Sequence, residues 1–575
     1  MELRKKIYPC VFIRKDIKRQ RIRVFSPNSA LYHPFTRRMA QFYYIFLILC
    51  LGLTYARKRI DPLVDTKQGL IRGLKADDGD YSMFLGIPYA TVDKNNPFGS
   101  AIPQQPFETV FEAYDDSAKC PQVDEFSNKE EGTLDCLHIN IYVPNNATSR
   151  NKLPVLVWIH GGSFEIGYSG RHLFGPKFLI RNDVILVTLN YRVGPYGFFC
   201  LDIPEVPGNQ GLKDQVLALR WIKDNIEAFG GDSNQITAMG ESAGAASVEL
   251  HILSPQEKLF SKAILQSASS VAPWVLLPPT NDTVYQISEK LGYSSNNLLE
   301  SLSFLATVDP LLVIAASEEL GINYRACVEK TFEGVESFLS EHPENIEIPK
   351  TKVMPILNGY NDKEYLMANP DNNPGFYSSD HFHSSLDILF DLDKDMEDIV
   401  THFYIGDEEI SEKVKSELID FLSDVHFNYP AQRSILKYIK SGVPNVYHYI
   451  FSYDGGRNFL KKRLNITDAG VCHADEIGYL FDLSYDKDFT EEDQLIIDRI
   501  TTLWTNFVKY GDPTPEPSKL IPIKWTPVTE NVLHYLDINT DLSMGTRPFH
   551  DRLAFWDLFY IANHENLRAL NYNRK

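Results

Sequence analysis

Residues 236–248, ITAMGESAGAASV, constrain the fold more than any other stretch of this 575-residue chain. Ser242 stands between Gly240 and Gly244, after an apolar run and before a run of small residues. The apolar run predicts a short strand and the small residues predict the start of a helix, which places Ser242 on the turn between them. The five-residue pattern G-x-S-x-G alone is common, so its meaning depends on the surrounding sequence.

The segments around this turn predict an α/β domain. Residues 154–160 (PVLVWIH) and 183–191 (DVILVTLNY) are nearly continuous apolar runs, which are typical of central strands covered on both faces. Residues 211–231 predict an amphipathic helix that a glycine pair closes. Its apolar positions recur every three or four residues, at Leu212, Val216, Leu219, Ile222, Ile226 and Phe229. We therefore expect a mostly parallel central sheet with helices on both faces.

A serine at a strand-to-helix turn presents its hydroxyl at the positive end of the helix. The flanking glycines let the strand and the helix pack closely, and Ala243, Ala245 and Ala246 keep the approach to the hydroxyl open. Such a serine needs a base, and the base needs a third group to orient it. The glycine-rich loop at residues 160–163 (HGGS) follows an apolar run and could supply backbone N–H groups to an oxyanion.

Taken together, the motifs resemble the type-B carboxylesterase family, which includes the cholinesterases and related lipases. The resemblance spans about residues 62–556 in the expected order and rests on FLGIPYA, DCLHINIYVP, VWIHGGSF, NYRVGPYGF, GESAGAASV, LFSKAILQSAS, GYNDKEY, GVCHADEIGYLF and LWTNFVKYGDPTP. It implies a single α/β-hydrolase domain over residues 57–575. It also implies hydrolysis of carboxylic esters without a metal or an organic cofactor.

The resemblance also assigns roles to individual residues. Ser242 matches the family nucleophile, Glu364 in GYNDKEY matches the acidic member, and His473 in GVCHADE matches the general base. A serine replaces a glycine that is common in the family's oxyanion loop. The implied oxyanion donors are the backbone N–H groups of Gly162, Ser163 and Ala243.

Seven cysteines bear on the cellular compartment. Cys120 and Cys136 match a disulfide of the family, which implies an oxidising environment. Cys200, Cys327 and Cys472 lack an obvious partner in the sequence, and we expect each to be a small buried apolar side chain.

The first 56 residues read as a leader. They carry eleven Lys/Arg and two Asp/Glu, a charge of +9. Because the whole chain has a net charge of −19, the remaining residues carry −28. Residues 42–56 are uncharged and have the proportions of a signal-peptide core, which predicts a signal peptide over Met39–Ala56 and a mature chain from about Arg57. An uncleaved signal anchor that starts at Met1 is the alternative. The acidic remainder argues against a nucleic-acid partner.

Three sequons, at Asn146, Asn281 and Asn465, predict glycosylation in exposed loops. The HFH stretch at residues 381–383 has no metal-ligand spacing and is interpreted as a loop.

We therefore predict a secreted serine carboxylesterase that acts on neutral small-molecule esters. Two alternatives remain open: a non-catalytic, cholinesterase-like cell-surface adhesion protein, and an esterase tethered to the membrane by its leader. The loop between Cys120 and Cys136 has no tryptophan, and Phe126 is its only aromatic residue, which argues against a site built for quaternary ammonium. The physiological ester and the oligomeric state are left open.

Overall fold

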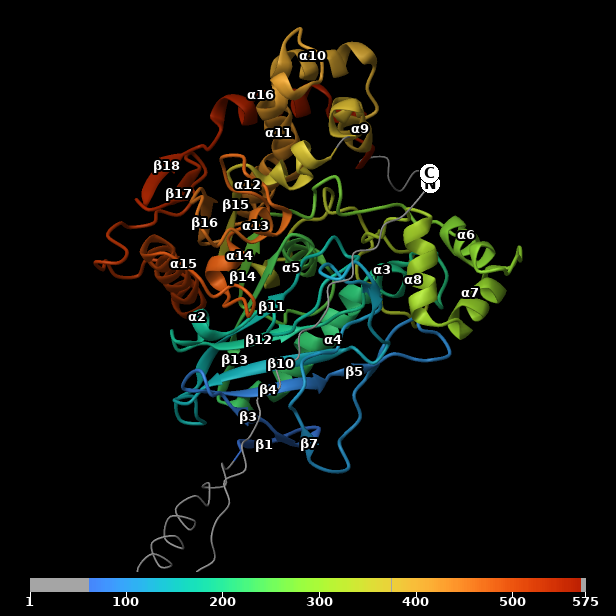
Figure 1. Cartoon of the computed structure of the whole chain (residues 1–575), viewed down its shortest axis with the longest axis vertical. Helices are drawn as coiled ribbons and strands as arrows, with labels where there is room; N and C mark the ends of the chain where they lie inside the picture. The colour runs from blue at the N-terminus through green and yellow to red at the C-terminus, as the bar shows by residue number, and fades with distance from the viewer. Residues whose placement is uncertain (1–60, 374, 570–575) are drawn as a thin grey trace, which may run out of the picture. The chain divides into compact units, whose positions relative to one another are not determined.

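The structure, a computed structural model, describes residues 61–373 and 375–569. The predicted leader and its cleavage point lie outside these residues. At the centre of the described chain is an 11-stranded sheet (Figure 1). Its strands, in spatial order, are β18 (Ser543–Thr546), β17 (His534–Ile538), β16 (Val446–Phe451), β15 (Ile356–Asn361), β14 (Lys262–Gln266), β13 (Gly231–Glu241), β11 (Leu153–Ile159), β12 (Ile185–Leu189), β10 (His138–Pro144), β4 (Tyr81–Pro88) and β3 (Leu74–Lys75).

The sheet is parallel from β12 to β17 and antiparallel at both edges. The two apolar runs that the sequence singled out form β11 and β12, which pair in parallel. Three small sheets lie outside it: β1 (Leu63–Thr66), β2 (Gly69–Arg72) and β7 (Phe111–Glu112); β5 (Ala90–Thr91) and β6 (Ile102–Pro103); β8 (Gln122–Val123) and β9 (Glu130–Glu131).

The helices cover the sheet or project from it. They are α2 (Lys177–Ile180), α3 (Gly194–Phe198), α4 (Gln210–Asn225), α5 (Ala243–Leu253), α6 (Asp282–Lys290), α7 (Leu298–Thr307), α8 (Pro310–Glu319), α9 (His381–Leu389), α10 (Lys394–Ile405), α11 (Lys415–Ser423), α12 (Tyr429–Lys440), α13 (Phe459–Leu464), α14 (Ile477–Leu480), α15 (Glu491–Tyr510) and α16 (His550–Ala562). A π-helical turn, η7 (Asp424–Asn428), joins α11 to α12. In the described residues, no single helix is long and apolar enough to cross a membrane.

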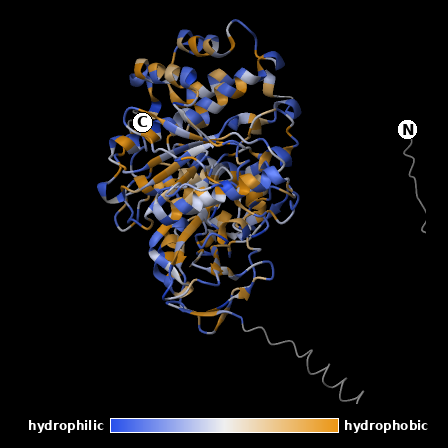
Figure 2. Ribbon diagram, turned by 90° about the vertical axis from the view of Figure 1, so that its left-hand side faces the viewer, coloured by the Kyte–Doolittle hydropathy of each residue, from blue (hydrophilic) through white to orange (hydrophobic). Residues whose placement is uncertain are grey.

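Each face of the sheet packs against its own set of helices. Val155 and Val157 of β11 belong to a core that includes side chains of α4 and α5. Leu156 and Trp158, which point to the opposite face, belong to a core that includes side chains of α15. In Figure 2 the hydrophobic strands lie in the interior. The prediction of a mostly parallel sheet covered on both faces is therefore confirmed. Alternate side chains of β11 enter the cores on opposite faces of the sheet, which explains why this strand is almost continuously apolar.

Two disulfides link the described chain. One joins Cys120 to Cys136, as the resemblance implies. The other joins Cys200 to Cys327 across 127 residues, so the expectation that both are unpaired was wrong. The two segments are also joined by Asn209, whose side chain hydrogen-bonds both the N–H and the C=O of Cys327. Cys472 is buried and free.

The loop interpretation of residues 381–383 was also wrong, because His381 begins α9. The Asp380 side chain caps this helix by accepting a hydrogen bond from the His383 N–H at 3.0 Å. His383 Nδ1 lies 2.8 Å from the Glu397 carboxylate. The three sequon asparagines are all exposed, which glycosylation requires, and glycosylation itself stays a prediction.

Candidate active site

Ser242 lies on the sharp turn between β13 and α5. Its backbone is at φ 57° and ψ −128°, a strained conformation for a residue with a side chain. The two flanking glycines make the turn possible. A Cβ on Gly240 would lie 2.3 Å from the carbonyl carbon of Gly244, and a Cβ on Gly244 would lie 2.0 Å from the Ile159 oxygen. Only glycine fits at either position, which is the packing reason that the sequence suggested.

The loop after β11 faces this turn. Gly162, Ser163 and Phe164 follow one another with φ of 109°, 56° and 63°. The Gly162 carbonyl accepts hydrogen bonds from the N–H groups of the third and fourth residues after it, which closes the loop. Within the described chain, the N–H groups of Gly162, Ser163 and Ala243 donate no hydrogen bond to protein. These are the three groups predicted to bind an oxyanion.

His473 and Glu364 are in direct contact. The Nδ1 of His473 lies 2.6 Å from the Glu364 Oε2, and the His473 N–H donates to the Glu364 carbonyl at 3.1 Å. The other carboxylate oxygen of Glu364 accepts the Asn361 N–H at 2.7 Å. Glu364 is completely buried, so its orientation is fixed. The contact with Glu364 favours the tautomer in which Nδ1 carries the proton and Nε2 keeps a free lone pair.

A second carboxylate contacts the other ring nitrogen. The Nε2 of His473 lies 3.1 Å from Oε1 of Glu241, the residue before Ser242. Burial lowers the pKa of His473, but the carboxylates of Glu241 and Glu364 outweigh burial and raise this pKa to about 9. Burial raises the pKa of Glu241 to about 8, despite the opposing effect of His473.

Glu476 is linked to the His473–Glu364 pair through Asn361. Its carboxylate accepts the Gln266 Nε2 and the Asn361 Nδ2, each at 2.7 Å. The same Asn361 amide nitrogen donates to the Cys472 carbonyl at 2.7 Å, directly before His473. Burial raises the pKa of Glu476. Asn361 thus ties both ends of the His473–Glu364 contact to the end of β15.

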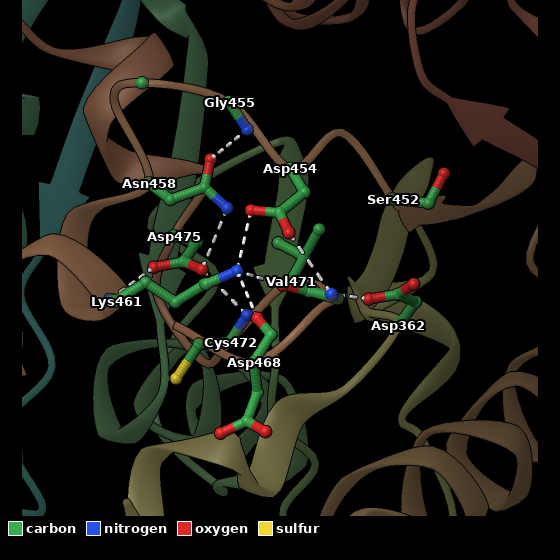
Figure 3. Close-up of polar contacts among 12 residues, drawn as sticks. Asp362, Ser452, Asp454, Gly455, Asn458, Lys461, Asp468, Val471, Cys472 and Asp475 are labelled. Carbon is green, nitrogen blue, oxygen red and sulfur yellow. Dashed lines mark hydrogen bonds and ion pairs between the residues drawn. The ribbon is translucent and has the colours of Figure 1, made fainter. Parts of the chain in front are cut away.

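The segment that carries His473 is anchored by a polar cluster around Asp475 and Lys461 (Figure 3). The buried Asp475 carboxylate accepts the backbone N–H groups of Leu460, Lys461 and Cys472 and the side-chain amide of Asn458, at 2.7–3.0 Å. The Lys461 ammonium donates to the Asp454 carboxylate and to two backbone carbonyls of the loop that precedes His473. These bonds fix the backbone on both sides of His473.

Ser242 and His473 line one cavity of about 400 Å³. In the described structure no hydrogen bond joins the Ser242 Oγ to the imidazole; such catalytic bonds often tighten only when substrate is bound. The rest of the wall is mostly apolar and aromatic, with four further charged side chains. It includes Ile166, Tyr168, Leu173, Phe174, Trp274, Tyr365, Met367, Phe427, Phe459 and Ile477, with Glu125, Glu241, Arg325 and Arg463.

Several residues at or near the cavity were not identified from the sequence. Glu241 could have been noticed, because it adjoins Ser242. Glu476, Arg325 and Asn361 each make a contact with a residue far away in the chain, which a local sequence pattern does not reveal. Of the residues predicted from the resemblance, four line this cavity: Ser242, His473, Gly162 and Ser163. Glu364 contacts His473, and Ala243 follows Ser242 at the start of α5.

Comparisons with known proteins agree with this geometry. The profile of the carboxylesterase family matches residues 60–556. Esterase FE4 of Myzus persicae is 33% identical over 78% of this chain and 83% of its own length. Cholinesterase of Mus musculus is 31% identical over 89% of each chain. The crystal structure of juvenile hormone esterase from Manduca sexta superposes with a TM-score of 0.75 at 28% identity, covering 87% of this chain and 99% of that one.

Proposed function

We propose that this chain, which belongs to the carboxylesterase family and hydrolyses carboxylic esters, cleaves neutral small-molecule esters through Ser242, His473 and Glu364. Its α/β-hydrolase fold is the one that the sequence predicted. The observation that carries the proposal is the 2.6 Å contact between His473 and the buried Glu364, at a cavity that Ser242 shares.

The first half of the proposed reaction forms an acyl-enzyme. The Ser242 Oγ attacks the ester carbonyl carbon while the Nε2 of His473 takes the hydroxyl proton. Glu364 holds the imidazole in the required tautomer and stabilises the imidazolium. The N–H groups of Gly162, Ser163 and Ala243 receive the negative charge on the carbonyl oxygen, and each such donor contributes about 10²–10³ in rate.

The second half releases the acid. The tetrahedral intermediate collapses, and the C–O bond to the alcohol breaks while His473 returns its proton to the leaving oxygen. Water then attacks the acyl carbon, with His473 again taking a proton. The free acid leaves and Ser242 regains its hydrogen. Every proton that moves in this scheme passes through His473, so no metal or organic cofactor is needed.

The test of this proposal is Ser242→Ala together with covalent labelling. The variant should lose about 10⁴-fold or more in ester hydrolysis. A fluorophosphonate should label Ser242 of the native protein and no other residue, as peptide mass spectrometry would report. Turnover retained by the variant, or label on a different serine, would refute the assignment.

We also propose that the protein is secreted. Its two disulfides support this, because disulfides persist in oxidising compartments. The predicted mature N-terminus is about Arg57, so N-terminal sequencing of material from a eukaryotic host is the measurement. A purified chain that still contains residues 42–56 and sediments with membranes would favour the tethered form.

A further inference from the structure

Arg325 occupies a fixed position on the cavity wall. In the chain, Arg325 lies between the end of α8 and the disulfide-bonded Cys327. Its side chain is 15% exposed. The backbone of Cys327 makes two hydrogen bonds with the Asn209 side chain, at 2.8 and 2.9 Å. The disulfide and Asn209 together hold the segment that presents Arg325, so its guanidinium is preorganised.

All the hydrogen bonds that Arg325 makes within the described chain use one of its three nitrogens. Nη1 donates to the Ser163 carbonyl at 2.8 Å, to the Glu165 carboxylate at 2.6 Å and to the Tyr324 carbonyl. Nε and Nη2 donate to no described residue. Since both nitrogens lack a partner in the described chain and neither is fully buried, both are accessible to solvent. One edge of the guanidinium is thus committed to the protein, while the other has no partner in the described chain, and Arg325 is one of the residues that line the cavity.

The position of Arg325 relative to the reaction centre follows from Ser163. Ser163 supplies a proposed oxyanion donor through its N–H, and its own carbonyl is bonded to Arg325. Arg325, Ser163 and Ser242 also line the same cavity, so a substrate that is bound at Ser242 shares this cavity with the guanidinium. Guanidinium N–H groups are strong donors to oxygen acceptors, and an aligned pair gives directional recognition.

The surrounding charges favour a neutral acceptor over an anionic one. Glu165 already neutralises Arg325 and is not part of the cavity wall. Arg463, the other arginine of the cavity wall, pairs with Glu125 in the same way, so neither arginine presents an unpaired positive charge to an anion. The residues after the predicted leader also carry a formal charge of −28.

We propose that Arg325 is a specificity-determining residue that hydrogen-bonds a neutral oxygen acceptor, such as a ketone or ether oxygen, located a few bonds from the scissile carbonyl of the ester. This inference rests on the proposed function and narrows its substrate class. The preferred substrate is a neutral ester with a second oxygen group close to the first, rather than a plain alkyl ester or an anionic one.

Three ethyl esters with one skeleton test the inference. Ethyl levulinate carries a ketone, ethyl 4-methylpentanoate has a methyl group in place of the ketone oxygen, and monoethyl succinate has a carboxylate there. The native enzyme should show a kcat/KM for the levulinate about tenfold above that for the methylpentanoate, after division by the hydroxide-catalysed rates. The succinate monoester should not exceed the levulinate.

Variants separate recognition from positioning. Arg325→Met also loses the bond to Ser163, so all three rates should fall, but the levulinate preference itself should disappear. Arg325→Lys should keep part of it. Arg463→Met, at another charged position of the wall, is the matched control and should leave the ratio unchanged. If the methionine variant does not fold, the native ratio and the lysine variant decide.

The outcomes distinguish the inference from the function beneath it. An unchanged levulinate preference in Arg325→Met, no preference in the native enzyme, or a preference for the succinate monoester would each overturn the inference alone. An enzyme that cleaves none of the three but cleaves 4-nitrophenyl acetate would also overturn it. Absence of all ester hydrolysis, with Ser242 unlabelled by a fluorophosphonate, would instead overturn the proposed function.

Discussion

The Nε2 of His473, the nitrogen proposed to accept a proton, lies 3.1 Å from the Oε1 of Glu241. The imidazole therefore sits between two carboxyl groups, with Glu364 on its other nitrogen. The electrostatic effects of Glu241 and Glu364 raise the pKa of His473 above its ordinary value of 6.5, although burial acts in the opposite direction. This geometry changes the pH dependence that the sequence suggests.

The first prediction concerns that pH dependence. The working imidazole is neutral, so kcat/KM rises with pH as His473 loses its proton. A free imidazole would place the fall in activity below roughly pH 6–7. With its pKa raised toward 9, the fall should begin at higher pH, and Glu241→Gln should move it downward because one carboxylate is gone. The measurement is kcat/KM from pH 5 to 10 for both proteins.

Glu125→Gln is the control for this experiment. Glu125 also lines the cavity, but it pairs with Arg463 rather than with His473, so its removal should leave the acidic limb in place. Because His473 and Glu241 are coupled, the profile reports the pair rather than either group alone. An acidic limb at the same pH in the native and Glu241→Gln proteins would show that this carboxylate does not act on the base.

The second prediction concerns the backbone on either side of His473. The Asp475 carboxylate accepts four hydrogen bonds, among them the Cys472 N–H at 2.7 Å (Figure 3). An amide in its place would turn one acceptor into a donor, so Asp475→Asn should release the loop. We expect kcat to fall by about 10²-fold, since small misplacements of catalytic groups have effects of that size. KM should change much less.

Asp468→Asn is the matched control for the loop. Asp468 contacts Lys461 only through its backbone carbonyl, which the substitution preserves, and its side chain pairs with Lys415. This variant should keep its kcat within about threefold, because Lys415 keeps a second carboxylate partner, Asp371. Equal losses in both variants would mean that general instability, rather than the position of His473, explains the effect.

Helices and strands could be predicted from the sequence more readily than contacts between residues far apart in the chain. The strand–turn–helix around Ser242 was predictable because its pattern is local, and β11 and β12 because buried strands are continuously apolar. Glu364 and His473 are 109 residues apart, and only the family resemblance could pair them. No such resemblance pointed to Arg325, whose contact with Ser163 spans 162 residues.

The Cys200–Cys327 disulfide was missed for the same reason. A pairing across 127 residues depends on where the chain returns to the fold, and three unassigned cysteines allow three different pairs. The loop prediction for the HFH segment was wrong for a different reason. Its helix is started by the side chain of Asp380, a capping signal that the search for metal spacing left out.

The third prediction compares the two disulfides. In the chain-entropy model, closing a loop of 127 residues stabilises the fold by about 5 kcal/mol and closing one of 16 residues by about 3 kcal/mol. Replacing Cys200 and Cys327 by serine should therefore lower the apparent Tm more than replacing Cys120 and Cys136. Calorimetry at one scan rate is the measurement. The reverse order would show that native packing around each bond, rather than loop length, sets its contribution.

The last prediction concerns substrate charge. Recognition of a quaternary ammonium group needs open aromatic faces. Phe126, 39% exposed, already has the Arg463 guanidinium 5.2 Å from its ring centre. A single exposed ring would in any case contribute about 0.5–1 kcal/mol, less than tenfold. The other aromatic side chains face a cavity in which Arg325 and Arg463 offset the carboxyl groups of Glu125 and Glu241, so its wall has no excess of negative charge to attract a cation. We therefore expect a neutral ester to be cleaved at least as well as the choline ester of the same acid.

The comparison for this last prediction is acetylcholine against its uncharged isostere 3,3-dimethylbutyl acetate, with tetramethylammonium as a competitor. The neutral ester should have the equal or higher kcat/KM, and the ammonium ion should not compete at micromolar concentration. Arg463→Gln removes the cation from the Phe126 ring, so it should raise the relative rate with acetylcholine. A native preference for acetylcholine above about tenfold, which is 1.4 kcal/mol, would contradict the assignment to neutral esters.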